Sequence, residues 1–189
     1  MKKYLCLISV TAAMAVTSSA TLVGFDGPFL PANWTQTVTN GGDGSVNTSG
    51  APVSIMLTSS NNNSSVVPVP SIVDFFITSP ISGTIQFDWS YSTADWNSIF
   101  DPFGWLRNGV FTQVTNNGTS TGSGTVSFSV MTGDQFGFRQ SSTDSNYGRA
   151  TTIITNFTNL TAIPEPSGTL ALGCVLGGGL LIRTRRIKV

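Results

Sequence analysis

The chain has 189 residues, equal numbers of basic and acidic side chains and no histidine. Without histidine, Ser-His-Asp and Cys-His nucleophilic triads and the usual zinc ligand sets are excluded. The single glutamate, Glu165, lies near the end of the chain, so acid–base catalysis would depend on aspartates alone. We therefore predict that the protein is not an enzyme, with an aspartate-dependent hydrolase as the alternative.

Residues 1–20 have the order of a secretory signal peptide. A basic start is followed by the apolar stretch Tyr4–Val16, which is too short for a durable membrane span, and then by small residues up to Ala20. We expect signal peptidase to cut between Ala20 and Thr21, so that the chain is exported. An uncleaved membrane anchor is the alternative.

The part that follows is acidic. Between Thr21 and Ile163 stand three arginines and eight aspartates, a net charge of −5. Such a surface repels nucleic acid phosphates, so we expect no nucleic acid partner. Both cysteines, Cys6 and Cys174, lie outside this part, and its stability must therefore come from burial rather than from disulfides.

Residues 21–162 repeatedly alternate apolar and polar residues with the period of two that is typical of β-strands. In the clearest case, 83–91, four large residues share one face: Ile85, Phe87, Trp89 and Tyr91. Further patterns or apolar runs occur at 54–57, 72–77, 125–130, 136–138 and 150–157. Asn108-Gly109 indicates a type I′ hairpin turn, because both residues tolerate positive φ, and Gly133-Asp134 indicates another turn. With no helical periodicity and no long repeat, we predict an all-β fold, a single antiparallel β-sandwich of jelly-roll type.

Aspartates fall in or beside the predicted loops of this sandwich. Asp95 and Asp101 bracket the loop 93–102, Asp88 ends the preceding strand, and Asp144 lies in another loop. No compact Asp-x-Asp-x-Asp-Gly sequence is present, so we expect no metal and no cofactor, with aspartates that are solvated or cap turns. A calcium ion held by these loops, through six to eight oxygens, is the alternative.

Three tryptophans lie where they could stack on sugar rings, as aromatic platforms do in carbohydrate-binding modules: Trp34, Trp96 and Trp105. We retain Trp96, in the acidic loop, and Trp105 as candidates for glycan stacking. Packing in the core is the alternative for each of them.

Residues 163–189 have a three-part order. An extended, proline-rich hinge disfavours helix and consists of Pro164, Glu165 and Pro166. The apolar run 168–182 would reach about 22 Å as a helix, short of a bilayer core of roughly 30 Å, so we predict a short transmembrane helix that anchors the chain only transiently. The basic tail 183–189 supplies a membrane stop on the cytoplasmic side from Arg183, Arg185 and Arg186.

This combination of Pro-Glu-Pro, apolar segment and arginine cluster resembles the PEP-CTERM sorting signal of Gram-negative bacteria, which is also filed as an ice-binding protein C-terminal domain. The resemblance covers 163–189. It implies recognition by an exosortase, a transpeptidase-like membrane enzyme thought to process the tail near Pro164–Pro166, and association with the cell surface, biofilm or extracellular polysaccharide. The stretches 87–93 and 133–138 also resemble domains commonly joined to this tail, but this second resemblance implies no particular activity.

The sequence thus predicts a protein that is exported across the inner membrane, anchored there transiently, and sorted to the cell surface or extracellular matrix. The main hypothesis is a surface or matrix protein of unknown molecular activity whose tail an exosortase cuts. A tail anchor that is never cut is the alternative for the tail. The alternative for the function is a carbohydrate-binding module that attaches to exopolysaccharide.

Overall fold

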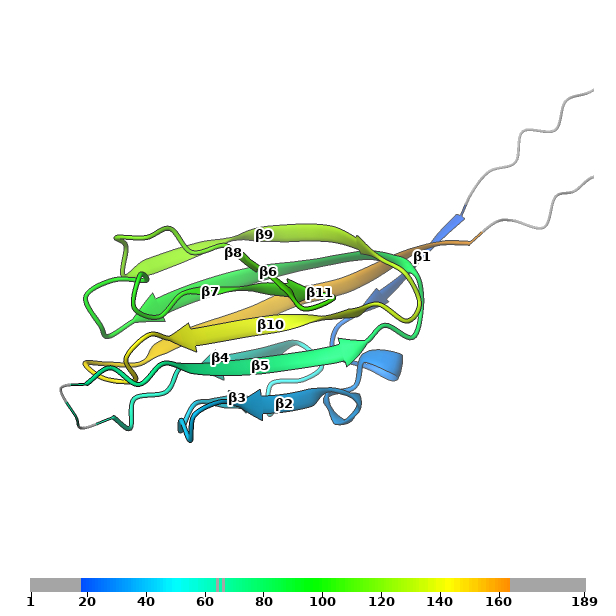
Figure 1. Cartoon of the computed structure of the whole chain (residues 1–189). Helices are drawn as coiled ribbons and strands as arrows, with labels where there is room; N and C mark the ends of the chain where they lie inside the picture. The colour runs from blue at the N-terminus through cyan, green and yellow to red at the C-terminus, as the bar shows by residue number, and fades with distance from the viewer. Residues whose placement is uncertain (1–17, 64, 66, 164–189) are drawn as a thin grey trace, which may run out of the picture. The chain divides into compact units, whose positions relative to one another are not determined.

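The computed structural model describes residues 18–163 except 64 and 66 (Figure 1). Residues 20–161 form one compact unit with its own core. Most of the predicted signal peptide, the Pro-Glu-Pro motif, the apolar run 168–182 and the basic tail lie outside the described residues. None of the helices in the described part is long and apolar enough to cross a membrane.

Strands make up nearly all of the regular structure in residues 18–163, apart from two three-residue 3₁₀ turns, η1 (Gly27–Phe29) and η2 (Pro31–Asn33). The strands are β1 (Ser18–Val23), β2 (Thr35–Val38), β3 (Ser45–Asn47), β4 (Ser54–Thr58), β5 (Ser71–Thr78), β6 (Gly83–Thr93), β7 (Phe103–Arg107), β8 (Val110–Gln113), β9 (Thr121–Val130), β10 (Gln135–Ser142) and β11 (Ala150–Ile163). The predicted signal-peptide cleavage point, between Ala20 and Thr21, falls inside β1.

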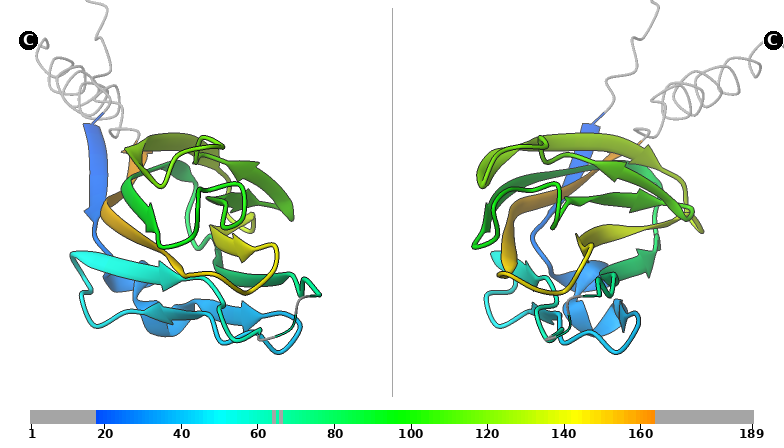
Figure 2. Two further views of the ribbon diagram at one scale, coloured as in Figure 1. Left: turned by 90° about the vertical axis from the view of Figure 1, so that its left-hand side faces the viewer. Right: turned by 60° about the vertical axis from the view of Figure 1, so that its left-hand side comes forward.

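The described strands form two antiparallel sheets that face each other (Figures 1 and 2). One sheet has the order β3-β4-β11-β6-β9, with β1 paired to β11, and the other has the order β2-β5-β10-β7-β8. β5, β6 and β7 each lie in the sheet opposite to the strand before them, and so do β9, β10 and β11. The prediction of an all-β sandwich of two antiparallel sheets is confirmed.

The two predicted turns are also present. Asn108 and Gly109 have φ values of 49° and 81° and connect β7 to β8, which is the conformation a type I′ hairpin requires. Gly133 has a φ of 94° and lies between β9 and β10. The side chain of Asn108 joins the two turns, because its amide donates to Asp134 Oδ1 (3.0 Å) and its Oδ1 accepts from the Gln135 N–H (2.9 Å).

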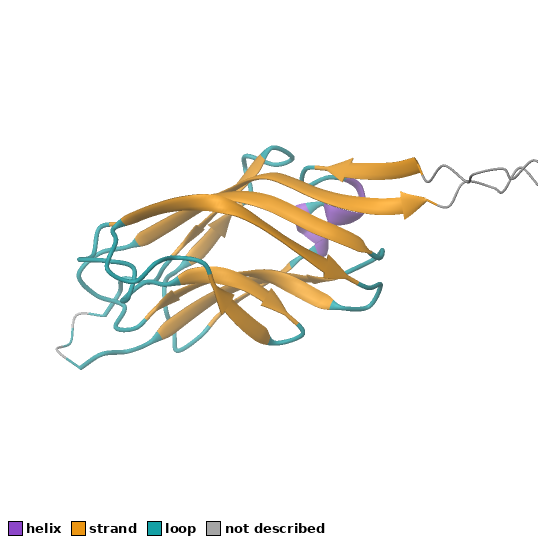
Figure 3. Cartoon of the chain, turned by 90° about the horizontal axis from the view of Figure 1, so that it is seen from above, coloured by secondary structure: helices purple, strands orange, loops and turns teal. Residues whose placement is uncertain are grey.

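Aromatic rings fill the interior near η1 and η2, which Figure 3 shows at one end of the two layers. Trp34 is 7% exposed, and its ring stacks on Phe75 (4.9 Å between centroids) and Phe138 (5.6 Å). Its indole N–H donates to the Phe29 carbonyl at 3.0 Å. Trp34 is therefore a core residue, and the idea that it stacks on sugars is wrong. Four residues predicted to face inward from β6 are all buried: Ile85, Phe87, Trp89 and Tyr91.

At the other end, the interior is polar. Gln140 on β10 and Thr152 on β11 are fully buried, and the Thr152 hydroxyl donates to Gln140 Oε1 across the two sheets at 2.7 Å. Gln140 Nε2 donates to the Asp101 carbonyl at 2.9 Å, and the Tyr91 hydroxyl donates to the same carbonyl at 3.0 Å. This polar layer lies directly beneath the loop 94–102 and fixes its second half to both sheets.

Candidate functional site

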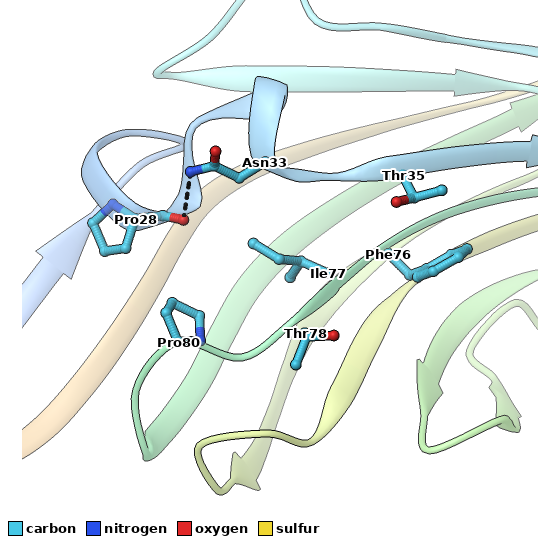
Figure 4. Close-up of a pocket in the computed structure, with 7 residues that line it drawn as sticks. All are labelled: Pro28, Asn33, Thr35, Phe76, Ile77, Thr78 and Pro80. Atoms are coloured by element: carbon cyan, nitrogen blue, oxygen red, sulfur yellow. Dashed lines mark hydrogen bonds between the residues drawn. The ribbon is translucent and has the colours of Figure 1, made fainter.

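Two of the hollows on the surface of the described residues are of similar size and lie at different places. One, of about 350 Å³, is lined by Pro28, Asn33, Thr35, Phe76, Ile77, Thr78 and Pro80 (Figure 4). Its lining contains no charged side chain, and the Asn33 amide is already engaged with the Pro28 carbonyl at 3.1 Å. No titratable group and no exposed aromatic ring of large area is available there to select a ligand.

The other hollow, of about 410 Å³, combines aromatic rings with carboxylates. It is lined by Asp95, Trp96, Phe100, Asp144 and Tyr147, and we call it the loop-end groove. The residues come from the loop between β6 and β7 and from the loop between β10 and β11. Register explains why these loops meet: β6 and β11 are antiparallel neighbours with Ala150 opposite Thr93, so the first loop begins beside the point where the second loop ends.

Backbone hydrogen bonds hold the two loops against each other. The Ala94 N–H donates to the Arg149 carbonyl (3.0 Å), and the Thr143 N–H donates to the Phe100 carbonyl (2.7 Å). Gly148 makes the close approach possible: its φ is 147°, and a Cβ there would lie 2.6 Å from the Ala94 carbonyl carbon. Tyr147, just before it, also has a positive φ of 61°. The walls of the groove are therefore fixed by the backbone.

The aromatic rings of the groove are largely open to solvent. Trp96 is 86% exposed and Tyr147 is 69% exposed, while Phe100 is 36% exposed. A large side chain exposed alone is ordinary, whereas three aromatic rings around one hollow form an exposed apolar surface of the kind found at binding sites. Of the two tryptophans retained as candidates for glycan stacking, Trp96 therefore lies in a groove.

Trp105 lies elsewhere. It is partly buried, and its ring stacks on Phe128 with centroids 4.1 Å apart and an interplanar angle of 10°. Because Trp105 belongs to β7 and Phe128 to β9, this pair joins the two sheets at their margin. Its main contact is structural, and the structure does not bring it together with Trp96.

Asp95 lies at the base of the groove and is only 6% exposed. Its Oδ1 accepts a hydrogen bond from the backbone N–H of Trp96 at 2.6 Å, which fixes the backbone at the base of that side chain. Its Oδ2 is buried and has no hydrogen-bond partner among the described residues. Burial raises the pKa of the Asp95 carboxyl, the Trp96 N–H opposes this, and the nearby charge of Asp144 adds to the rise.

Asp101 lies deeper, is fully buried, and does not line the groove. Burial raises the pKa of its carboxyl to about 6, against the hydroxyls of Ser142, Ser59 and Thr93 and with a small contribution from the charge of Asp95. The Thr93 hydroxyl donates to Asp101 Oδ2 (3.1 Å). Asp101 Oδ1 makes no hydrogen bond of good geometry within the described part of the chain. The hydroxyls of Ser142 and Ser59 nevertheless lie close enough to the carboxyl to oppose the increase in its pKa.

A hydrogen-bonded chain connects this buried carboxyl to the surface. The Asp95 N–H donates to the Thr93 hydroxyl (3.0 Å), which donates to Asp101, and the Asp95 carboxylate holds the Trp96 N–H. These short contacts tie the backbone at Trp96 to the polar layer, and they fix the point from which its exposed ring projects.

The aspartates proposed as calcium ligands do not all meet. Asp88 faces outward from β6 and accepts hydrogen bonds from the Thr125 hydroxyl (2.5 Å) and the Asn156 amide (2.7 Å). Asp95, Asp101 and Asp144 lie at the loop end instead. Within the described residues, no group of three or more His, Cys, Asp or Glu is placed to hold a metal ion.

Two groove residues were not singled out from the sequence, Phe100 and Tyr147. Both lie in loops, where no periodicity reports the direction of a side chain. The only available signal for Tyr147 was its position in Asn146-Tyr147-Gly148, a turn-like stretch in which a large aromatic residue is unusual.

No family model matches the chain, and no curated protein matches it. Among solved structures, it is similar to the family 11 carbohydrate-binding module of a cellulosomal cellulase from Clostridium thermocellum (9% identity, 81% of this chain, 99% of that chain, TM-score 0.42). It is also similar to a family 35 carbohydrate-binding module from the same organism (12%, 71%, 97%, TM-score 0.35). A third is a carbohydrate-binding module of Cellvibrio mixtus lichenase 5A in complex with cellotriose (8%, 78%, 98%, TM-score 0.31). Because all three TM-scores are below 0.5, the function must be argued from the residues of this chain.

Proposed function

We propose that the sandwich is a carbohydrate-binding module that attaches the protein to exopolysaccharide through the loop-end groove. The observation that carries this proposal is the exposure of Trp96 and Tyr147 around one hollow of about 410 Å³. A pyranose ring has an apolar face of C–H groups and a rim of hydroxyls. Aromatic faces bind the first, and a few placed polar groups bind the second. The alternation of strands between the two sheets supports the jelly-roll type of sandwich for this module.

The polar groups for such a ligand are carboxylates. Asp144 Oδ1 accepts a hydrogen bond from the Asn146 N–H at 3.0 Å. This turn does not use the other carboxylate oxygen, Oδ2. Carboxylates accept hydrogen bonds and cannot donate them while ionised, so sugar hydroxyls would be the donors. Binding without catalysis is the activity that these residues support.

For delivery, we propose export by the signal peptide of residues 1–20 and sorting by residues 163–189. An exosortase would cut near Pro164–Pro166 after transient anchoring in the inner membrane, which leaves the sandwich at the cell surface or in the matrix. The support is the order of hinge, apolar run and arginines in the sequence. Comparing the mass of the mature protein in cells with and without the exosortase tests it, since an unchanged C-terminus would contradict processing.

The binding proposal is tested with purified residues 21–163, which contain nearly all of the compact unit. We expect this protein to bind at least one glycan on an array and Trp96→Ala to lose that binding. Met131→Ala is the matched control, because Met131 is 69% exposed and lies in the β9–β10 turn, away from the groove. If the protein is folded by circular dichroism and binds none of the glycans, the proposed carbohydrate-binding function is contradicted.

A further inference from the structure

No positively charged side chain of the described sandwich lines the groove. Its basic side chains are three arginines, and each forms an ion pair: Arg107 with Asp134 (3.1 Å), Arg139 with Asp74 (2.7 Å) and Arg149 with Asp43. The remaining carboxylates at the loop end, Asp95, Asp101 and Asp144, have no arginine partner among these pairs.

This leaves a groove with uncompensated negative charge. Asp95 and Asp144 line it, and the two are close enough for the charge of Asp144 to disfavour ionisation of Asp95. Asp95 is more than nine-tenths buried and keeps an oxygen without a partner. An ionised carboxylate buried without a counter-charge is unfavourable, and carboxylates lining a cleft concentrate the field in it and attract cations.

The aromatic rings act in the same direction. A cation is attracted to the face of tryptophan most strongly, and to tyrosine and phenylalanine as well, and aromatic cages are a known means of binding ammonium groups. Trp96, Phe100 and Tyr147 surround the same hollow as the two carboxylates. Rings and carboxylates together select a ligand that is both a sugar and a cation.

We propose that the groove binds polysaccharides that carry protonated amines, that is, amino sugars without an N-acetyl group, in preference to neutral or uronic acid polymers. This inference rests on the proposed function and adds the class of ligand to it. The sugar face lies on Trp96, the ammonium group donates a hydrogen bond to the Asp144 carboxylate, and the buried Asp95 carboxylate adds negative charge beneath the groove. Charge-assisted bonds of this kind are about twice as strong as neutral ones.

A metal ion is the other cation to consider. Calcium takes six to eight oxygen ligands, whereas the described residues offer no group of three acidic, histidine or cysteine side chains at one point. The exposed aromatic rings would also have no role in binding a metal. An ammonium group needs only one or two carboxylates and benefits from the rings, so it fits the groove better.

The test compares oligosaccharides of equal length with purified residues 21–163 by isothermal titration calorimetry: a chitosan oligomer, the fully N-acetylated chitin oligomer and an oligogalacturonate. The titrations are run at about pH 6, where sugar amines are protonated, with low salt and with a chelator present. We expect the chitosan oligomer to bind at least about tenfold more tightly than the chitin oligomer, the oligogalacturonate not to bind, and salt to weaken the chitosan binding.

Variants separate the inference from the proposed function. Asp144→Asn and Asp95→Asn should remove the preference for the amine while binding of the neutral oligomer persists, and Trp96→Ala should lose both. Asp26→Asn is the matched control, since it makes the same change of charge beside η1, where asparagine caps as well as aspartate.

Equal affinity for the amine and the N-acetylated oligomer would overturn the inference and leave the carbohydrate-binding function standing. Failure to bind any glycan would remove both. Binding that appears only when calcium replaces the chelator would show that the carboxylates hold a metal, and would also overturn the inference.

Discussion

Near η1 and η2 the space between the sheets is filled by aromatic rings, whereas at the groove end it is filled by hydroxyl, amide and carboxyl groups. Around Trp34, five phenylalanine rings lie within 6.0 Å of its centroid: Phe25, Phe75, Phe136, Phe138 and Phe157. At the other end, Gln140, Thr152 and Asp101 are buried to the same degree.

The two regions have different physical roles. Aromatic packing is favourable for almost any arrangement that excludes water, and it tolerates loops of many shapes above it. A buried polar network is stable only when its partners are in place, so it selects one conformation for the loop 94–102 that carries Trp96. Stability comes mainly from the first region, and the geometry of the groove comes from the second.

The largest loss of stability is expected for Trp34→Ala. It removes a fully packed ring and leaves a cavity, which typically reduces the free energy of unfolding by about 3–5 kcal/mol. Urea unfolding of residues 21–163 followed by fluorescence measures it. A reduction below about 1 kcal/mol would mean that the aromatic region does not dominate the stability.

The next effect is a dependence on pH that originates at the groove end. The folded pKa of Asp101 is raised from 3.8 to about 6, so the folded state holds its proton more tightly than the unfolded chain. Its contribution to stability is present below about pH 4 and is lost as pH rises to about 6, by at most about 3 kcal/mol. Asp101→Asn should flatten the stability curve over this window.

A control for that experiment is provided by carboxyls whose pKa values are lowered, such as Asp43, held down by Arg149, and Asp134, held down first by Asn108. Their contributions are lost as pH falls through and below about 4, outside the window of Asp101. A wild-type stability that rises between pH 4 and 6 would contradict the assignment of a neutral, buried Asp101.

A smaller effect should come from the contact between the sheets in the polar layer. Thr152→Val keeps the shape of the side chain but leaves Gln140 Oε1 without its donor, which costs about 1–3 kcal/mol for a buried group. In a double-mutant cycle with Gln140→Leu, we expect the combined loss to be less than the sum of the two single losses. Additive losses in thermal or urea unfolding would show that the pair does not act as a unit.

The smallest effect on stability is expected for Trp96→Ala. Because the ring is 86% exposed, its removal should change the free energy of unfolding by less than about 0.5 kcal/mol, although glycan binding is lost. Trp34→Ala and Trp96→Ala thus make the same chemical change at the two ends, and unfolding and binding measurements on both give the sharpest contrast. A loss of stability in Trp96→Ala comparable to that in Trp34→Ala would contradict the separation of stability and binding between the two ends.

The sequence predicted the strands that have one apolar face, because alternation with period two needs no knowledge of the partner strand. The inward face of β6 and the turn at Asn108-Gly109 follow from local rules alone. For Trp34 the sequence left sugar stacking and core packing open, since it comes directly after η2 and before β2, where no alternation indicates its direction.

The polar layer was beyond such rules. Gln140 and Thr152 occupy inward positions of their strands, but a polar residue reads as outward unless its partner across the sheets is known. The groove has the same origin, because it depends on the register that places the loop 94–102 next to the loop 143–149. Trp96 was a candidate from its residue type and its acidic loop, and only the structure supplied Tyr147 as its neighbour.

β11 begins next to the groove at Ala150 and runs for 14 residues to Ile163, after a bulge near Asn156. At about 3.3 Å for each residue, this single strand extends roughly 45 Å. Because the strand runs from the groove end to the opposite end of the sheet, the groove and Ile163 are separated by most of this length. The longest strand of the described residues therefore sets the spacing between the groove at its start and residue 163 at its end.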